Sequence, residues 1–180
     1  MIEHLSDGVI EHLSGSSMNT FDNNIHEYYT VYVLWEEPEY NYYQAEAMEY
    51  GKVYEIELGK KLGSNWNTQK KLEVEIWWYT MIGLLDFINE KWLQVIECKT
   101  KSGERKEKDI HTSRQFRFYN WWCNNHDYQF ILHQFNKKNW EIKEDTINRK
   151  DDKFEEEFIE KAWQIERFLK QFNIKLKHDI

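Results

Sequence analysis

Three charged residues interrupt the most apolar part of the chain, at Asp86, Glu97 and Lys99. The segment GLLDFINEKWLQVIECKTKSG, from Gly83 to Gly103, otherwise has the composition of a sheet interior. Two carboxylates that meet can share a divalent cation, because Mg²⁺ in proteins takes one or two carboxylates and keeps several waters. An ammonium beside them can neutralise charge that develops in a hydrolytic transition state. The spacing fits metal-assisted hydrolysis, and it fits equally well three solvated charges at a sheet edge.

This chemistry requires a hairpin that brings both carboxylates to one face. Two apolar runs, 81–88 and 92–98, are separated by a polar turn and predict such a hairpin. A tight turn would place Asp86 opposite Val95, with Glu97 on the same face, because residues two apart on a strand share a face. Directly opposed side chains lie about 5 Å apart and diagonal ones about 7 Å. A register shifted by one residue would move Asp86 to the other face.

The elements around the hairpin predict an α/β fold of the mixed α+β kind. Helix formers fill 41–62 and end at Gly63, and a second helix is expected from the spacing of aromatic residues in 111–125. Alternating residues predict a strand at 71–79, and the run 127–135 predicts another. The expected core is therefore a helix, a three-stranded antiparallel meander, a helix and a fourth strand.

The two ends of the chain are expected to be additions to this core. An apolar stripe in 151–173 predicts an appended C-terminal helix. Residues 1–28, which contain the duplicated pentapeptide IEHLS, are expected to form a peripheral segment, and 29–180 a single domain. A short strand is expected at 29–35. With 180 residues, of which 41% are hydrophobic and 17% aromatic, the chain is long enough for one well-packed core.

Composition also restricts the environment and the partners. Two cysteines, Cys98 and Cys123, cannot build a disulfide framework, which favours a reducing, cytoplasmic setting. We expect no signal peptide and no membrane span, since the most apolar window is far shorter than the ~20 residues that a bilayer requires. The net charge of −8 opposes nucleic-acid binding, but residues 99–117 carry seven basic against three acidic side chains. Such a strip fits a phosphate-facing edge or a solvated loop.

The hairpin resembles the core of the PD-(D/E)XK nuclease superfamily, specifically its RecB-like exonuclease branch. In that branch a Gly-x-x-Asp strand precedes an apolar strand that ends in (Asp/Glu)-x-Lys, as Gly83-x-x-Asp86 and Glu97-x-Lys99 do here. The resemblance implies a restriction-endonuclease-like core. It also implies Mg²⁺ or Mn²⁺ held by Asp86, Glu97 and the backbone carbonyl of Cys98, with Lys99 assisting the attacking water.

Two flanking motifs extend the resemblance over residues 51–135. Gln115-x-x-x-Tyr119 is similar to a pattern of the branch that is associated with DNA contact. Upstream, GKVYEIEL resembles a Gly-x-x-His-Glu segment, with Tyr54 where a metal-binding His is expected. The implied nucleic-acid contacts are Gln115, Tyr119, Lys101, Arg105 and Arg114, and the supplementary site residues are Glu55, Tyr54 and His111. Some CRISPR-associated members hold an iron–sulfur cluster through four cysteines, and with two cysteines none is expected here.

The resemblance implies a metal-dependent nuclease that hydrolyses phosphodiester bonds of DNA, favoured on single strands or ends. Two alternatives remain open. One is a non-catalytic protein of this fold that binds nucleic acid or a protein partner, and the other is a restriction- or resolvase-type endonuclease. The C-terminal helix could complete the core, form a homodimer or bind a partner. The Asn, Lys and Ile content suits a small viral or mobile-element protein, which would work inside an infected host cell.

Overall fold

The computed structural model describes residues 5–6, 9–10, 12–34, 36–101, 112–147 and 149–176. Its centre is a six-stranded mixed sheet in the order β3-β5-β6-β7-β8, with β4 paired to β5. The strands of this sheet are β3 (Leu13–Ser14), β4 (Asn67–Ile76), β5 (Tyr79–Asn89), β6 (Gln94–Lys101), β7 (Gln129–Asn136) and β8 (Ile142–Ile147). A separate small sheet contains β1 (Leu5–Ser6), β2 (Val9–Ile10) and β9 (Lys175–Leu176).

The helices complete the fold that the sequence predicts. They are α1 (Gly15–Asn23), α2 (Ile25–Tyr28), the π-helical segment η1 (Tyr29–Val33), α3 (Tyr42–Leu62), α5 (Arg114–Asn125) and α6 (Phe154–Lys170). The predicted mixed α+β class is confirmed, because α3, the antiparallel meander β4-β5-β6, α5, β7 and α6 follow in the expected order. Strand β8, which pairs with β7, was not predicted.

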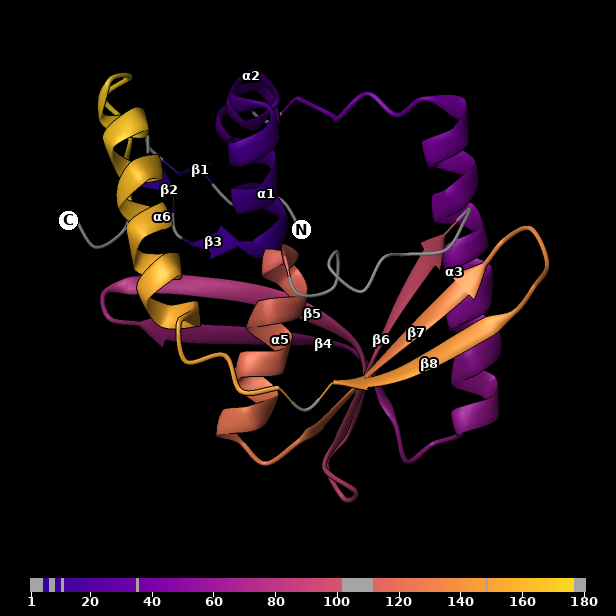
Figure 1. Ribbon diagram of the computed structural model, residues 1–180. Helices are drawn as coiled ribbons and strands as arrows, with labels where there is room; N and C mark the ends of the chain where they lie inside the picture. The colour runs from indigo at the N-terminus through magenta and orange to yellow at the C-terminus, as the bar shows by residue number, and fades with distance from the viewer. Residues whose placement is uncertain are drawn as a thin grey trace.

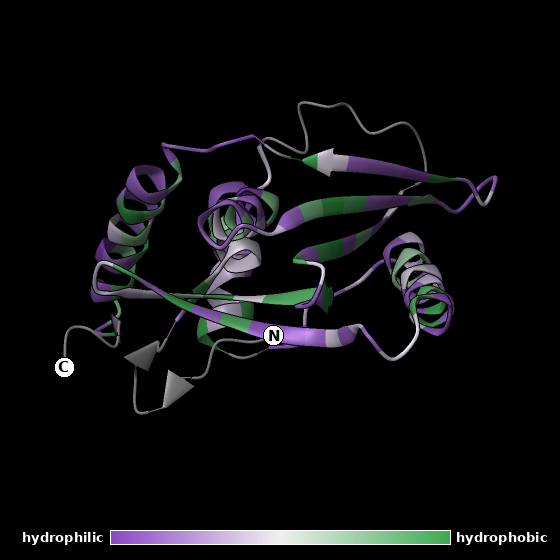
Figure 2. Cartoon of the chain, turned by 90° about the horizontal axis from the view of Figure 1, so that it is seen from below, coloured by the Kyte–Doolittle hydropathy of each residue, from purple (hydrophilic) through white to green (hydrophobic). Residues whose placement is uncertain are grey.

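Helices α3 and α5 lie on opposite faces of the sheet, as the two perpendicular views show (Figures 1 and 2). Alternation along the strands supplies both faces with apolar side chains. The α5 face belongs to the larger core, which includes Leu85, Val95, Phe116, Phe130 and Leu132 together with the buried stripe of α6. The α3 face forms a smaller cluster of Trp66, Phe87, Ile96, Cys98 and Ile131. Cys98 therefore faces away from its neighbours Glu97 and Lys99, which lie on the α5 side.

The hairpin between β5 and β6 differs from the predicted one in register. Ile88, not Asp86, lies opposite Val95, because the connection is a four-residue loop instead of a tight turn. Asn89 Oδ1 accepts a hydrogen bond of 2.9 Å from the Trp92 backbone N–H and so fixes the loop. The shift is two residues, which keeps Asp86 on the face predicted for it, since side chains alternate with a period of two.

Strands β5 and β6 separate soon after the hairpin. Their ladder has its last pair at Phe87 and Ile96, whereas β4 follows β5 along nearly its whole length. Farther along the same strand, β3 pairs in parallel with Met81 and Ile82. Between these two partners the backbone of Leu84 is bonded by a side chain. The Tyr119 hydroxyl donates to the Leu84 carbonyl and accepts from the Leu84 N–H, each at 3.0 Å.

The prediction that the N-terminal segment is peripheral is wrong for residues 12–28. Leu13, Met18 and Tyr28 are at most 1% exposed and belong to the larger core. Helix α1 begins with a capping box, in which Ser14 and Ser17 satisfy each other's backbone N–H groups. A cap and a buried stripe make this segment part of the fold.

The prediction of a strand at 29–35 is also wrong. Residues 29–33 form η1, which continues from α2 and buries Val31 and Val33. Tyr28 and Val31 are three residues apart and share a helical face toward the core, so packing of these side chains outweighs the β propensity of the sequence YTVYV. Among the residues that the structure describes, no helix has both the length and the apolar character required to cross a bilayer.

Two glycines permit the close contacts that bring helices to the site. A Cβ atom at Gly83 would lie 2.5 Å from Cε1 of Tyr119 and 2.9 Å from Cε1 of Phe118, so α5 packs directly on the backbone of β5. At Gly15 a Cβ atom would lie 2.7 Å from the backbone of Gln115. Both glycines are thus required by the approach of α5.

We predict that Gly83→Ala lowers the free energy of unfolding by about 1–3 kcal/mol, because the methyl group overpacks the ring of Tyr119. Urea denaturation measures this. Gly59→Ala is the matched control and should change stability by less than about 1 kcal/mol, since its methyl group meets only the Phe87 ring at 3.3 Å and removes a helical glycine. An unchanged stability of Gly83→Ala would contradict the packing described here.

Candidate active site

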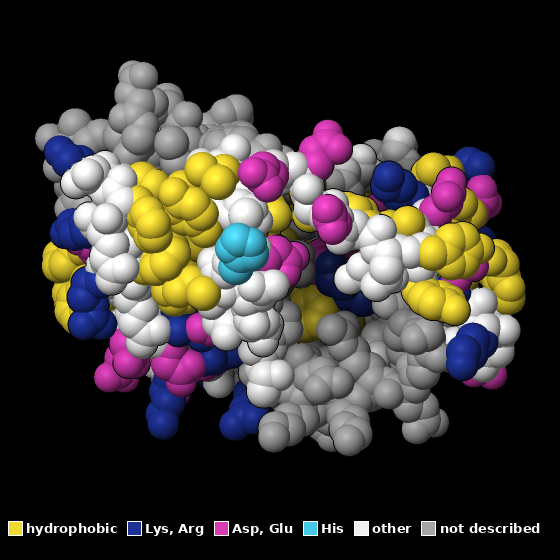
Figure 3. All heavy atoms as spheres, turned by 90° about the horizontal axis from the view of Figure 1, so that it is seen from above, with side chains coloured by type: hydrophobic (Ala, Val, Ile, Leu, Met, Phe, Trp, Pro, Cys, Tyr) yellow, Lys and Arg dark blue, Asp and Glu magenta, His cyan; other side chains and the backbone are white. Residues whose placement is uncertain are grey.

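A pocket of about 250 Å³ opens where β5 and β6 separate. Asp86, Glu97 and Lys99 line it together, so the structure brings the three charges of the hairpin to one place. Its remaining walls come from β5, α5, η1, the end of β3 and the start of α1. The residues are Ser14, Gly15, Ser16, Tyr32, Ile82, Gly83, Leu84, Gln115, Phe118 and Tyr119. The surface seen from above is hollowed between the side of α1 and α2 and the side of α3, with charged side chains in the hollow (Figure 3).

Glu97 is held by only one of its two carboxylate oxygens. Its Oε1 atom accepts from Lys99 Nζ at 2.8 Å and from Gln115 Nε2 at 3.2 Å. The other oxygen, Oε2, is buried and has no hydrogen-bond partner among the described residues. The residue as a whole is only 1% exposed. A buried carboxylate oxygen without a partner is costly, so this atom is where a cation or a proton would be most stabilising.

Asp86 occupies the gap between the separating strands. Its Oδ2 atom accepts from the Cys98 backbone N–H at 2.7 Å, and its Oδ1 atom has a longer contact of 3.4 Å with Gln69 Nε2. The carboxylate therefore bonds the backbone of β6 where the ladder with β5 has ended. This contact fixes Asp86 next to Glu97 in the pocket.

The pKa values of the site reflect its burial. Burial raises the pKa of Glu97 to about 8, opposed by Lys99 and assisted by the charge of Asp86. Burial also raises the pKa of Asp86, although Lys99 and the Cys98 N–H act against it. For Lys99, burial acts to lower the pKa, but the charges of Glu97 and Asp86 outweigh it and raise the value. Lys99 is therefore a cation at neutral pH and is suited to stabilise negative charge instead of accepting a proton.

The donor set fits one hard divalent cation. Asp86 and Glu97 would hold it through the oxygens that the protein leaves weakly bonded or unbonded, with waters in the remaining positions. Within the described part of the chain, no group of three or more His, Cys, Asp and Glu side chains is arranged to bind a metal. Two carboxylates with water suit Mg²⁺ or Mn²⁺ and do not suit a fully protein-ligated zinc.

Gln115 and Tyr119, both on α5, link Glu97 to the backbone of β5 through hydrogen bonds. The Gln115 side-chain amide donates to Glu97 and also to the Tyr119 hydroxyl, each at 3.2 Å. Since the Tyr119 hydroxyl also bonds both backbone groups of Leu84, its hydrogen-bonding capacity is filled within the protein. Burial raises the pKa of Tyr119, so it stays protonated. These contacts favour a positioning role for both residues, and the nucleic-acid contact expected of them stays a prediction.

Tyr54 does not line the pocket. It lies on the α3 face, where its hydroxyl lies 2.9 Å from Nδ1 of His133 and its ring stacks on Phe135. Glu55, the next residue of α3, is not among the residues that line the pocket either. Burial raises the pKa of Glu55 and the charge of Asp86 raises it further, while Lys99 and Lys52 act against the shift. The supplementary role expected of Glu55 and Tyr54 stays a prediction.

The basic residues expected to contact nucleic acid lie differently. The Arg114 guanidinium pairs with Asp22 of α1 at 2.6 Å and does not line the pocket. Lys101 ends β6, but its side chain lies outside the described part of the structure. Arg105 and His111 lie wholly outside the described residues. Their expected roles stay predictions.

Several pocket residues were not foreseen from the sequence. Ser14 and Ser16 come from the segment that was expected to be peripheral, Tyr32 comes from the segment that was expected to be a strand, and Gln69 reaches Asp86 from β4. The only sequence signal is the spacing of Ser14 and Ser17, which predicts a helix N-terminus but no site. Their place depends on the pairing of β3 with β5, a contact between distant parts of the chain.

Comparison with known proteins establishes the fold and no more. No protein-family model matches the sequence, and no curated protein matches it. A solved structure named SSO0001 aligns with a TM-score of 0.56 and 17% identity, over 89% of this chain and 78% of its own. Another, from Eubacterium rectale and named "Putative exonuclease", aligns with a TM-score of 0.52 and 14% identity, over 88% of this chain and 80% of its own. The chain therefore shares its fold with a protein named as an exonuclease.

We predict that Glu97 makes the metal-free protein less stable as the pH rises. Its pKa is raised from 4.5 to about 8 by folding, so its contribution to stability is fully present below about pH 4.5 and is lost as the pH rises toward 8. Glu97→Gln removes this dependence. As the pH rises from about 4.5 to 8, the free energy of unfolding of Glu97→Gln should therefore increase relative to that of wild type, by up to about 1.4 kcal/mol per pH unit.

Chemical denaturation in EDTA between pH 5 and 8.5 measures this difference. The control is Glu75→Gln, which changes an exposed carboxylate on β4. A stability difference for Glu97→Gln that does not change with pH would show that Glu97 is not protonated in the pocket.

Proposed function

We propose that this protein is a divalent-metal-dependent nuclease that hydrolyses phosphodiester bonds of DNA. The observation that supports it most directly is the buried Glu97 with one unbonded oxygen, beside Asp86 and a cationic Lys99 in an open pocket. The fold shared with a protein named "Putative exonuclease" supports the same reaction class and favours strand ends as substrate.

In this proposal Asp86 and Glu97 hold Mg²⁺ or Mn²⁺, assisted by the backbone carbonyl of Cys98. When bound, such a cation polarises the phosphoryl oxygen and acidifies a water. Lys99 lies 2.8 Å from Glu97 and places a positive charge where the phosphoryl group gains negative charge. Gln115 keeps the Glu97 carboxylate oriented through its 3.2 Å contact, which reduces the reorganisation needed during reaction.

A non-catalytic protein of this fold is the second candidate. The observation that favours it is Tyr54, which stands where the resemblance implies a metal-binding His and whose hydroxyl is engaged with His133. The two candidates differ in whether the chain cleaves DNA, because the second would bind nucleic acid or a protein partner without cleavage. The restriction- or resolvase-type endonuclease is a variant of the first candidate, and cleavage of circular DNA would reveal it.

We predict cleavage of labelled DNA that requires Mn²⁺ or Mg²⁺ and stops in EDTA. Glu97→Gln and Lys99→Met should each reduce the rate about 100-fold or more, as expected for groups that stabilise a transition state. The controls are Glu75→Gln and Lys143→Met, which make the same chemical changes at exposed positions of β4 and β8. Metal-independent cleavage, or variants as active as wild type, would contradict the catalytic role of the pocket.

We also predict that Mn²⁺ raises the melting temperature of the protein. Saturation at 100 times the dissociation constant stabilises the folded state by about 2.7 kcal/mol. Asp86→Asn should abolish the effect, whereas Asp127→Asn, in an exposed turn, should leave it intact. A shift that survives Asp86→Asn would place the metal elsewhere, and a shift without DNA cleavage would support the non-catalytic candidate.

A further inference from the structure

A second cavity, of about 420 Å³, lies on the other side of the first turn of α5. Gln115 lines the pocket that contains Asp86 and Glu97, called the acidic pocket below, and its chain neighbour Phe116 lines this cavity. The Lys99 ammonium lies 5.8 Å from the centre of the Phe116 ring, which connects the two places. The other lining residues are Arg117, Asn120, Ile147, Arg149, Lys150, Asp151, Asp152, Lys153 and Glu157.

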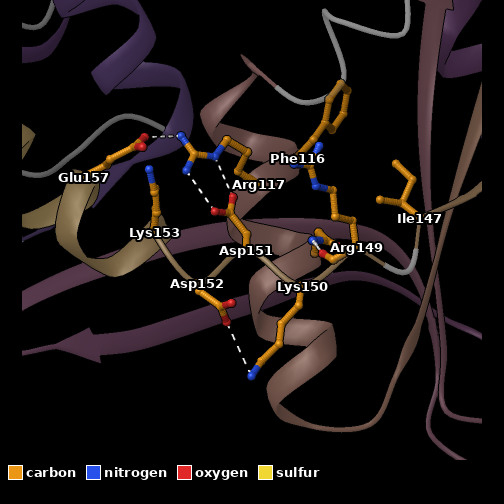
Figure 4. A pocket seen from close by; sticks show the side chains of 10 residues that line it. Phe116, Arg117, Ile147, Arg149, Lys150, Asp151, Asp152, Lys153 and Glu157 are labelled. Atoms are coloured by element: carbon orange, nitrogen blue, oxygen red, sulfur yellow. Dashed lines mark hydrogen bonds and ion pairs between the residues drawn. The ribbon is translucent and has the colours of Figure 1, made fainter.

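The charges of this cavity are not all compensated. Arg117 is bound in a fork by Asp151, at 2.6 and 3.1 Å, and also contacts Glu157. Lys150 lies 3.4 Å from Asp152. Within the part of the chain that the structure describes, Arg149 and Lys153 form no ion pair with a carboxylate, although the charge of Arg149 acts on Asp151 and lowers its pKa. Figure 4 shows the Arg149 side chain on the Phe116 side of the cavity, apart from the Arg117 fork.

The cavity also contains a buried acceptor without a donor. Asn120 is 6% exposed, and its Nδ2 atom donates to the Arg149 carbonyl. Its Oδ1 atom has no hydrogen-bond partner among the described residues. A ligand that brings an N–H or O–H group would satisfy this oxygen.

We propose that this cavity binds one nucleotide unit, with its phosphate at Arg149. The Arg149 guanidinium takes the phosphate, Asn120 Oδ1 accepts from the base or the sugar, and Phe116 and Ile147 provide apolar walls. A cavity next to the acidic pocket would hold the substrate strand beside the bond that is cut. This role rests on the proposed nuclease function, whereas nucleotide binding itself does not.

Arg149→Ala is the decisive variant, because Asn120 and Asn124 bond the Arg149 backbone carbonyl, which alanine retains. The control is Arg167→Ala, which removes the same charge from an exposed position of α6. Calorimetry in EDTA, so that no metal recruits the ligand, compares dAMP, inorganic phosphate and a short single-stranded oligonucleotide.

We expect wild type and Arg167→Ala to bind dAMP alike and Arg149→Ala to bind it about tenfold more weakly. In Arg149→Ala, oligonucleotide affinity should fall together with dAMP affinity if the cavity takes one unit of a strand. An oligonucleotide affinity that Arg149→Ala leaves unchanged restricts the cavity to free nucleotides and overturns its role in substrate binding.

Equal dAMP affinity of wild type and Arg149→Ala, or phosphate binding as tight as dAMP binding, overturns the nucleotide site. DNA cleavage without nucleotide binding would leave the nuclease proposal intact, and nucleotide binding without cleavage would leave the cavity intact.

Discussion

The separation of β5 from β6 is the constraint on which the rest of this structure depends. Two strands that part inside a fold expose backbone groups that water cannot reach, and each such group must find another partner. Here the partners are side chains. The Asp86 carboxylate bonds the Cys98 N–H, and the Tyr119 hydroxyl bonds both polar groups of Leu84. The pocket exists because the strands part, and the residues that satisfy the parted strands are also the residues that form its walls.

Helix α5 is fixed by the same arrangement. Tyr119 reaches Leu84 only because Gly83 lacks a side chain, and the start of the helix approaches α1 only because Gly15 also lacks one. One turn before Tyr119, Gln115 then lies where its amide bonds both Glu97 and the Tyr119 hydroxyl. The helix, the strand edge and the buried carboxylate therefore form a single hydrogen-bonded unit.

The sequence predicted the parts of this unit that depend on local periodicity. Helix α3 and strands β4 to β7 follow from spacing, and Asp86 remained on the face of Glu97 because a two-residue error in register preserves the parity of a strand. The error itself came from the loop, where the Asn89 side chain binds the Trp92 N–H and Leu93 adopts a φ of 51°. No periodicity encodes such a loop. The pocket wall formed by Ser14 and Ser16 could not be predicted either, because it depends on the pairing of β3 with β5 and not on the local sequence.

The instability of the charged cluster and its chemical capacity have one physical origin. Removing Glu97 from water raises its pKa and leaves one oxygen without a partner, which disfavours the anion in the metal-free protein. The same removal strengthens every interaction that Glu97 makes with a cation, since the surroundings screen charge less than water does. Lys99 compensates only part of this charge, because its 2.8 Å contact is to the other oxygen. The ionised Glu97 carboxylate, of which the protein bonds only one oxygen, is therefore unfavourable in the metal-free protein and is stabilised when a cation binds. The difference in free energy between these two states favours cation binding.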